Sequence, residues 1–187
     1  MSSKNILKLM KDKEIEFVDF RFTDPRGKLQ HLTMDATIVD DEMLEEGVFF
    51  DGSSIAGWKA INESDMILKP DLARPIVDPF NSHNTLNIFC DILDAVKKES
   101  YERDPRGTAK KAENYLKKSG VGDKAYFGPE PEFFTFDEVR FENKMNTSNF
   151  TVDSSEGPYN TGKIYENGNM GHRPGIKGGY FPVPPVD

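Results

Sequence analysis

Two short stretches of the sequence gather side chains that can do chemistry. The first is FDGSSIAGW at residues 50–58, where two glycines permit tight turns that present a carboxylate, two hydroxyls and the only Trp together. The carboxylate of Asp51 and the hydroxyls of Ser53 and Ser54 can together bind a cation or an amine. An Asx turn between two elements, with Trp58 packed on the domain, explains the same spacing, so both interpretations stay open at this point.

The second stretch is GPEPEFF at residues 128–134, in which prolines stiffen an extended segment. Glu130 and Glu132 are two positions apart, so they share one face with their Cα atoms about 6.5 to 7 Å apart. Carboxylates in this arrangement can each bind one metal ion of a pair. Their mutual repulsion and the neighbouring phenylalanines, which suggest partial burial, favour a metal ion or an Arg partner. Two solvated glutamates on an edge strand are the alternative.

Other residue types that often form sites give weaker signals. His31, His83 and His172 are far apart and lack metal-ligand spacing, so we expect ordinary surface or core histidines. The phosphate-binding pattern GxxxxGK[ST] does not occur in the sequence. With one cysteine, Cys90, the chain has no internal disulfide framework and no zinc site built on paired cysteines.

The composition favours a globular cytoplasmic protein. Of the 187 residues, 36% are hydrophobic and 14 are Phe, which is enough to build a core. The formal net charge of −8 argues against nucleic-acid binding. No stretch approaches the roughly 18 apolar residues of a membrane span, and charged residues interrupt any signal-peptide core at the N-terminus. We therefore expect no membrane partner.

The first hundred residues have the pattern of a small sheet with little helix. Ser2 or Ser3 can cap a short helix with Ile6, Leu7 and Met10 on one face. A β-hairpin is expected over residues 15–34, around the turn at residues 24–27. An acidic helix then follows Asp40 and stops at Gly47, and two further strands are expected at residues 65–69 and 85–93. The fold class predicted from these elements is α+β.

A charged stretch at residues 97–106 suggests a domain boundary, which divides the chain into residues 1–100 and 101–187. Asp104 and Pro105 begin a helix whose apolar residues recur at helical spacing as far as Gly120. Residues 125–141 favour a strand, and residues 143–180 a long irregular loop. Because the final residues are apolar and have no closing helix or strand, we expect a chain cut short.

Four segments together resemble the N-terminal portion of bacterial-type (class I) glutamine synthetases. They are FFDGSSIAGW at 49–58, YERDPRGTAKKA at 101–112, YFGPEPEFF at 126–134 and KGGYFPVPPVD at 177–187. The resemblance covers nearly the whole chain, although the family's chains are more than twice as long. It implies a β-grasp N-terminal domain over residues 1–100 and the start of a catalytic domain over residues 101–187.

The resemblance also implies a reaction and a role for individual residues. The family makes L-glutamine from L-glutamate, ammonia and ATP through γ-glutamyl phosphate. By this resemblance Asp51 binds ammonium and takes its proton, and Ser54 and Tyr180 belong to the same ammonium site. Glu130 would hold the Mg²⁺ or Mn²⁺ ion that engages ATP, and Glu132 the ion nearer the glutamate γ-carboxylate. The remaining metal, nucleotide and glutamate ligands would lie beyond Asp187.

The family's active sites lie between neighbouring subunits of a dodecamer, so we expect the isolated chain to be inactive. One alternative is a relative that joins glutamate to an amine or a polyamine. Another is a stand-alone β-grasp interaction module that uses the sheet of residues 15–93. The joint presence of Asp51, Ser54 and Tyr180 favours ammonia as the nucleophile.

Overall fold

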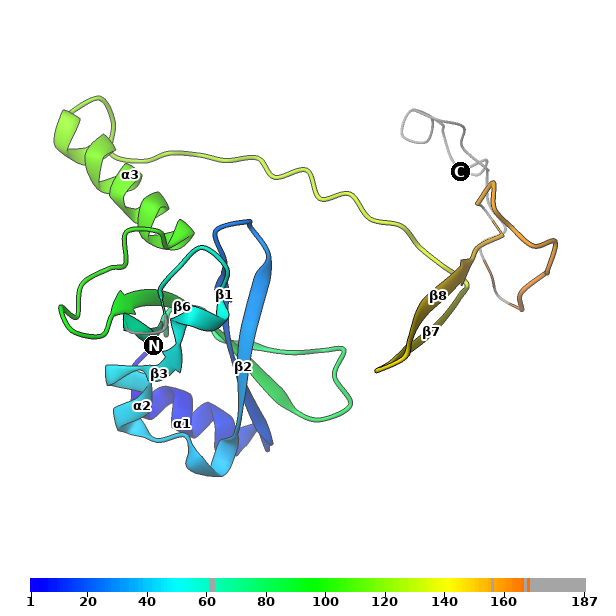
Figure 1. Cartoon of the computed structure of the whole chain (residues 1–187), viewed down its shortest axis with the longest axis horizontal. Helices are drawn as coiled ribbons and strands as arrows, with labels where there is room; N and C mark the ends of the chain where they lie inside the picture. Colours follow the sequence, from blue (N-terminus) through cyan, green and yellow to red (C-terminus); the bar gives the residue numbers. More distant parts are fainter. Residues whose placement is uncertain (61–62, 156, 167, 169–187) are drawn as a thin grey trace. The chain divides into compact units, whose positions relative to one another are not determined.

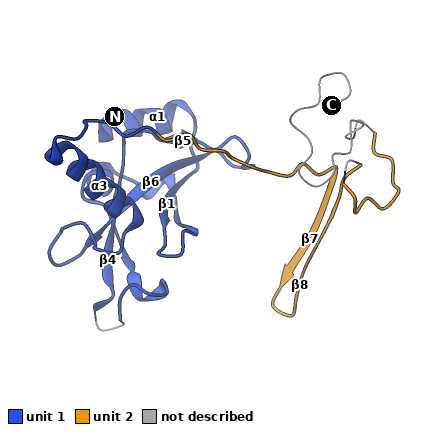
Figure 2. Cartoon of the chain, turned by 90° about the horizontal axis from the view of Figure 1, so that it is seen from above, with its two compact units in different colours: residues 1–126 blue, residues 127–187 orange. Residues whose placement is uncertain are grey.

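The computed structural model describes residues 1–60, 63–155, 157–166 and 168. The chain forms two compact units, residues 1–126 and residues 127–187, which are coloured separately in Figure 2. Within the described residues, no helix has both the length and the apolar character needed to cross a membrane. Each unit is described by itself below.

A curled sheet of six strands forms the centre of unit 1. The strands run in the order β2-β1-β6-β4-β3, and the short β5 also pairs with β6. The central pair, β1 and β6, is parallel, whereas the other pairs are antiparallel. The strand bounds are β1 Phe17–Thr23, β2 Leu29–Asp35, β3 Val48–Asp51, β4 Asp65–Pro70, β5 Ile76–Val77 and β6 Thr85–Asp94.

Two helices, α1 (Ser3–Asp12) and α2 (Asp41–Glu46), lie side by side in Figure 1 and pack on this sheet. Ser2 caps α1 by accepting a hydrogen bond from the backbone N–H of Asn5, and Asp40 caps α2 in the same way. The helices and strands share one apolar core that includes Ile6, Met10, Val18, Phe20, Leu44, Met66, Leu68, Leu86 and Ile88. The predicted hairpin, both helices and the two later strands are therefore confirmed.

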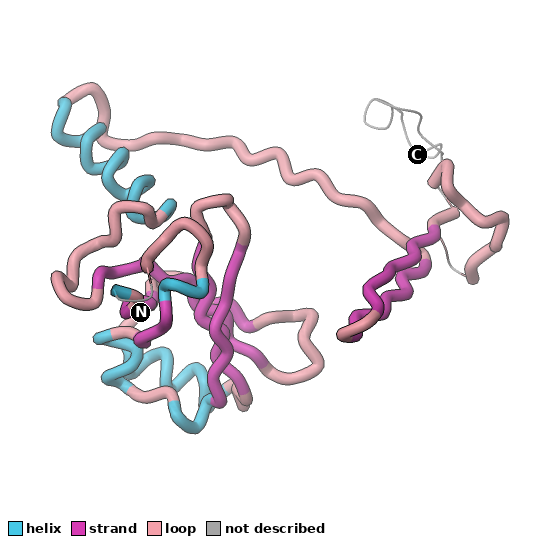
Figure 3. The backbone as a smooth tube through the Cα atoms, in the orientation of Figure 1, coloured by secondary structure: helices cyan, strands magenta, loops and turns pink. Residues whose placement is uncertain are grey.

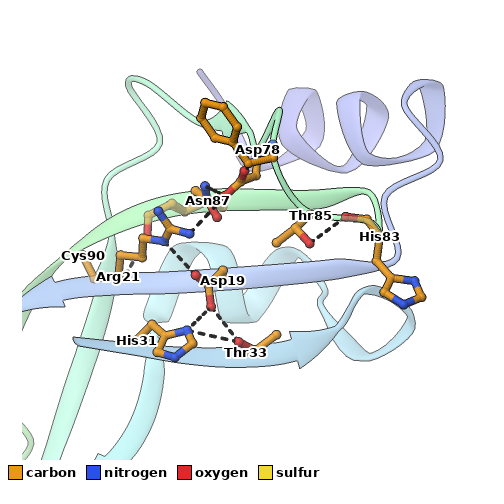
Figure 4. A network of polar contacts seen from close by, with 11 residues as sticks. Asp19, Arg21, His31, Thr33, Asp78, His83, Thr85, Asn87 and Cys90 are labelled. Carbon is orange, nitrogen blue, oxygen red and sulfur yellow. Dashed lines mark hydrogen bonds and ion pairs between the residues drawn. The ribbon is translucent and has the colours of Figure 1, made fainter. Parts of the chain in front are cut away.

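The face of β1 opposite the core carries a polar network rather than solvated charges (Figure 4). The Asp19 carboxylate, 4% exposed, accepts hydrogen bonds from Arg21 Nε at 2.7 Å and Thr33 Oγ1 at 2.6 Å. His31 Nδ1 lies 2.6 Å from the same carboxylate. Burial alone would raise the pKa of Asp19, but these hydrogen bonds outweigh it and hold that pKa below its usual range. His31 therefore belongs to this polar network, although its side chain is largely exposed.

The third helix, α3 (Pro105–Ser119), begins and ends where the sequence predicts, at Asp104 and Gly120. The Asp104 carboxylate, 1% exposed, accepts hydrogen bonds from the backbone N–H groups of Arg106 and Gly107, each at 3.1 Å. It also accepts one from the backbone N–H of Ile92 in β6 at 3.1 Å. A single side chain therefore caps the helix and joins it to the sheet.

We expect Asp104→Ala to lower the free energy of unfolding by about 2–4 kcal/mol, because it removes a cap and leaves a buried N–H of β6 unpaired. The matched control is Asp40→Ala, which removes the exposed cap of α2 and should cost about 1 kcal/mol. Urea unfolding followed by circular dichroism measures both values. Equal losses in the two variants would contradict the second role of Asp104.

The described residues after 124 differ from the strand expected at 125–141 and from the loop expected at 143–180, of which residues 169–180 lie outside the described part of the chain. Residues 124–136 contain no helix or strand (Figure 3), because Pro129 and Pro131 lack the N–H groups that a sheet ladder needs. The strands instead form an antiparallel hairpin of β7 (Glu138–Lys144) and β8 (Thr147–Asp153). The predicted strand is therefore wrong except at residues 138–141, and the predicted loop is wrong where β7 and β8 run.

A polar cluster joins this hairpin to the residues that follow it. The Asp153 carboxylate, in a residue only 3% exposed, accepts hydrogen bonds from Asn160, Thr161 and Tyr165. The Tyr165 hydroxyl oxygen also lies 2.8 Å from Glu138 Oε2 at the start of β7, so the two carboxylates share its single proton. The hydrogen bonds that Asp153 accepts, led by that of Thr161, lower its pKa to about 2. These side chains tie residues 160–165 to the hairpin.

Candidate functional site

Asp51 is the last residue of β3 and caps the short 3-10 helix η2 (Gly52–Ser54). Its Oδ1 accepts two hydrogen bonds from Ser53, one from the backbone N–H at 2.8 Å and one from the hydroxyl at 2.6 Å. The backbone N–H of Gly52 donates to the carbonyl of Ser64 at 2.7 Å, which ties the loop to the chain just before β4. The Asx turn expected from the sequence is therefore present, and it fixes the carboxylate.

The electrostatics of this loop keep Asp51 ionised. The Ser53 hydroxyl, followed by the Ser53 backbone N–H, holds the pKa of Asp51 below its usual range. Asp51 and Ser54 are both exposed, so a small solute can reach their oxygen atoms. A fixed anion beside hydroxyl groups can attract a small cation and place its nitrogen for reaction.

Gly52 fits where no larger residue does. A Cβ atom at this position would lie 2.2 Å from the sulfur and 2.7 Å from the Cγ of Met66, whose side chain is fully buried in the core. The carbonyl oxygen of Ser64 would be 3.1 Å away on another side. The loop therefore passes directly over the core, and its position depends on glycine.

Trp58, near the end of the loop, is 6% exposed and packs on the domain. Its ring lies 5.6 Å from that of Phe22, 6.0 Å from Phe50 and 5.9 Å from Tyr101, measured between centroids. This packing agrees with the structural interpretation of Trp58. It also means that the loop closes onto an aromatic cluster rather than extending into solvent.

Glu130 and Glu132 are exposed in the extended segment of unit 2. The phenylalanines around them are also exposed, at 89% for Phe127, 81% for Phe133 and 83% for Phe134, so the partial burial suggested by the sequence is wrong for this unit. Among the described residues, no group of three or more His, Cys, Asp or Glu side chains is placed to hold a metal ion. The two carboxylates would need further ligands to complete a metal site.

The candidate residues fall in different parts of the structure. Asp51 and Ser54 belong to unit 1, and Glu130 and Glu132 to unit 2. Tyr180 and His172 lie outside the described residues. The structure brings Asp51 and Ser54 together on one loop.

Sequence reasoning missed two contacts with this loop. The Tyr101 hydroxyl donates to the carbonyl of Trp58 at 3.1 Å, and Arg103 Nη1 donates to the carbonyl of Gly57 at 2.7 Å. Both donors lie in the segment YERDPRGTAKKA at 101–112, which supports the family resemblance and the domain boundary but gives no sign of a contact with this loop. No periodic pattern predicts such contacts, because the partners are 43 and 46 residues apart.

Comparisons with known proteins match both parts of the chain to one family. The family model described as glutamine synthetase, beta-Grasp domain, matches residues 14–95, and the model described as glutamine synthetase, catalytic domain, matches residues 102–187. The glutamine synthetase of Rhizobium meliloti is 59% identical over 186 residues, and that of Methylococcus capsulatus is 56% identical over 187 residues. Each alignment covers 100% of this chain but only 40% of the relative.

A solved structure of similar fold is the glutamine synthetase of Plasmodium falciparum, with a TM-score of 0.66 and 25% identity over 100% of this chain and 37% of that chain. The matches confirm the expected fold class, a β-grasp domain followed by the beginning of a catalytic domain. With both family models matched in order and identities of 56% and 59% over the full chain, this chain belongs to the glutamine synthetase family.

Proposed function

We propose that this chain is part of a glutamate–ammonia ligase, which makes L-glutamine from L-glutamate, ammonia and ATP through γ-glutamyl phosphate. The observation that carries the proposal is the 59% identity over the whole chain to a relative named glutamine synthetase. The chain spans 40% of the length of that relative. We therefore assign the activity to the longer protein and expect this chain alone to be inactive.

In this proposal Asp51 binds ammonium and takes its proton, while Ser54 and Tyr180 help to hold the ion. Asp51 suits the first task because two hydrogen bonds from Ser53 fix its Oδ1 and keep the carboxylate ionised. An aspartate is a weak base for ammonium, since its reference pKa is about 3.9. Its main contribution is therefore to select the cation and place its nitrogen for attack.

Glu130 and Glu132 would hold divalent cations, either Mg²⁺ or Mn²⁺. Carboxylate oxygens suit such ions, and both glutamates are exposed on a segment with no helix or strand of its own. The ions would neutralise the negative charges that ATP and glutamate bring together. Further ligands would come from the part of the longer protein that follows residue 187.

The proposal extends to domains, assembly and location. Residues 1–100 would form the β-grasp domain and residues 101–187 the start of the catalytic domain, close to the family matches at 14–95 and 102–187. The longer protein would assemble as a cytoplasmic dodecamer with its sites between subunits. In the compact units α3 groups with the first domain, because Asp104 and Arg106 join it to the sheet.

The test is phosphate release from ATP by the full-length product of the natural gene, with glutamate and ammonium each present or omitted. The 187-residue chain is run alongside as a control. We expect release only with both substrates and none from the short chain. Phosphate release that does not depend on ammonium but increases with an amine would favour the amine ligase. A natural gene product of only 187 residues would favour the interaction module.

We expect this chain alone to bind Mn²⁺ weakly or not at all. Two glutamates leave most of the coordination shell to water, and the described residues hold no third acidic or imidazole ligand near them. Isothermal titration calorimetry with MnCl₂ measures the affinity, and Glu132→Ala serves as the comparison. Submicromolar binding that Glu132→Ala abolishes would show that this chain already contains a complete metal site.

A further inference from the structure

The loop of residues 51–58 is anchored at both ends by different parts of unit 1. At its start, the N–H of Gly52 donates to the carbonyl of Ser64. At its end, the carbonyls of Gly57 and Trp58 accept hydrogen bonds from Arg103 and Tyr101. Because these two carbonyls are consecutive in the chain, the pair of donors fixes both the position and the direction of the backbone there.

Tyr101 is well suited to hold the loop because it is itself fixed. It is 7% exposed, and its backbone N–H donates to the carbonyl of Ile92 in β6 at 2.8 Å. Its ring packs edge-on against Trp58, with an interplanar angle of 73°. The loop end thus rests on a residue tied to the central strand of the sheet.

Lys59, the residue directly after the loop, forms an ion pair beside Tyr101. Its Nζ lies 2.9 Å from Asp94 Oδ2 and 5.5 Å from the centroid of the Tyr101 ring. The Asp94 carboxylate, at the end of β6, has a pKa lowered to about 2, chiefly by its hydrogen bond with Lys59. Ring packing, an ion pair and two hydrogen bonds therefore converge on the end of the loop.

We propose that Tyr101 and Arg103 are positioning residues for the ammonium site, because they hold the loop in the geometry that Asp51 and Ser54 need. The inference rests on the proposed function of Asp51. It gives the segment between the β-grasp strands and α3 a part in the reaction, although neither residue touches the ammonium ion. Arg103 lies at the start of the catalytic-domain match, so that segment would set the shape of a loop in the preceding domain.

The test uses the full-length protein with Tyr101→Phe and Arg103→Met, which each remove one donor to the loop. We expect each variant to raise the KM for ammonium about three- to tenfold, as the loss of one hydrogen bond allows, and to leave the KM for ATP within about twofold. The matched control is Glu102→Gln, an exposed neighbour between the two donors. Arg103→Lys, which keeps a charged donor, should restore part of the loss.

A second readout follows the loop itself. Amide hydrogen exchange, measured by mass spectrometry, should become faster over residues 52–58 in both variants and stay unchanged in the control. Unchanged exchange would show that the contacts do not hold the loop. Faster exchange with an unchanged KM for ammonium would overturn the positioning role. Failure of the proposed function is visible separately, because the unmutated protein would then show no ammonium dependence.

Discussion

Asp51→Ala in the full-length protein is expected to reduce ammonium-dependent turnover by about a hundredfold to a thousandfold and to change the KM for ATP little. The reason is that the proposed role of Asp51 is to bind and deprotonate the nucleophile. The defect should be largest at low ammonium, where selection of the cation limits the rate. Initial rates over a range of ammonium concentrations at saturating ATP and glutamate measure it.

Asp35→Ala is a closely matched control for this experiment. The Asp35 carboxylate accepts hydrogen bonds from the N–H and the hydroxyl of Thr37 at 2.8 and 2.6 Å, in the same arrangement as Asp51 with Ser53. The Thr37 hydroxyl likewise holds the pKa of Asp35 below its usual range. The two substitutions remove the same kind of turn, so only a role in the reaction separates them. Equal activities in the two variants would remove Asp51 from the mechanism.

Gly52→Ala is expected to lower the free energy of unfolding by about 1–3 kcal/mol, since a buried Met must move to admit the new methyl group. The same shift would displace Asp51, and a misplacement of about 1 Å can cost about a hundredfold in rate. We therefore expect both stability and ammonium-dependent turnover to fall. Urea unfolding of this chain and initial rates of the full-length protein measure the two effects.

Two further variants test whether the loss in Gly52→Ala comes from contact between the new methyl group and Met66 or simply from replacing a glycine. Gly122→Ala adds the same methyl group where its nearest neighbour, Leu116 Cδ1, is at 3.6 Å, an ordinary contact. It should leave stability and activity nearly unchanged. Met66→Ala removes the colliding atoms, so its combination with Gly52→Ala should cost less than the sum of the single changes. Additive losses would mean that the methyl group does not collide with Met66.

Local signals in the sequence predicted most of unit 1. Ser2, Asp40 and Asp104 are strong caps, and Gly120 adopts the left-handed conformation, with φ of 71°, that ends a helix. Strand β3 was missed because it has four residues, and β5 because it has two, which is too short for an alternating pattern. Caps are local, so one sequence is enough to place them.

Unit 2 was harder to predict because its composition suggests a loop. The hairpin signal was an alternation of apolar residues, in which Val139 pairs with Val152 and Phe141 with Phe150 on one face. The turn at Met145 and Asn146 lacks the glycine that usually marks a two-residue hairpin turn. The prediction gave more weight to the polar, loop-like composition than to the alternation of apolar residues, so it missed the hairpin.

The candidate site was predictable only in part. The sequence DGS predicted the turn at Asp51 because an aspartate can accept a hydrogen bond from the residue two positions later. The roles of Asp51, Ser54, Tyr180, Glu130 and Glu132 stay predictions from family resemblance. The contacts of Tyr101 and Arg103 could not be predicted from one sequence, because they arise only when distant segments fold together.

The parallel pairing of β1 with β6 sets the order in which the protein can fold. Phe17 pairs in register with Thr85, so the first strand to be synthesised meets the last strand of its sheet. At about 5–20 residues per second, the β1–β2 hairpin leaves the ribosome several seconds before β6 is complete. Its apolar face stays exposed during that time, because its partner strand has not yet been synthesised. The apolar face of the nascent β1–β2 hairpin is therefore a surface that a chaperone could protect until β6 is made.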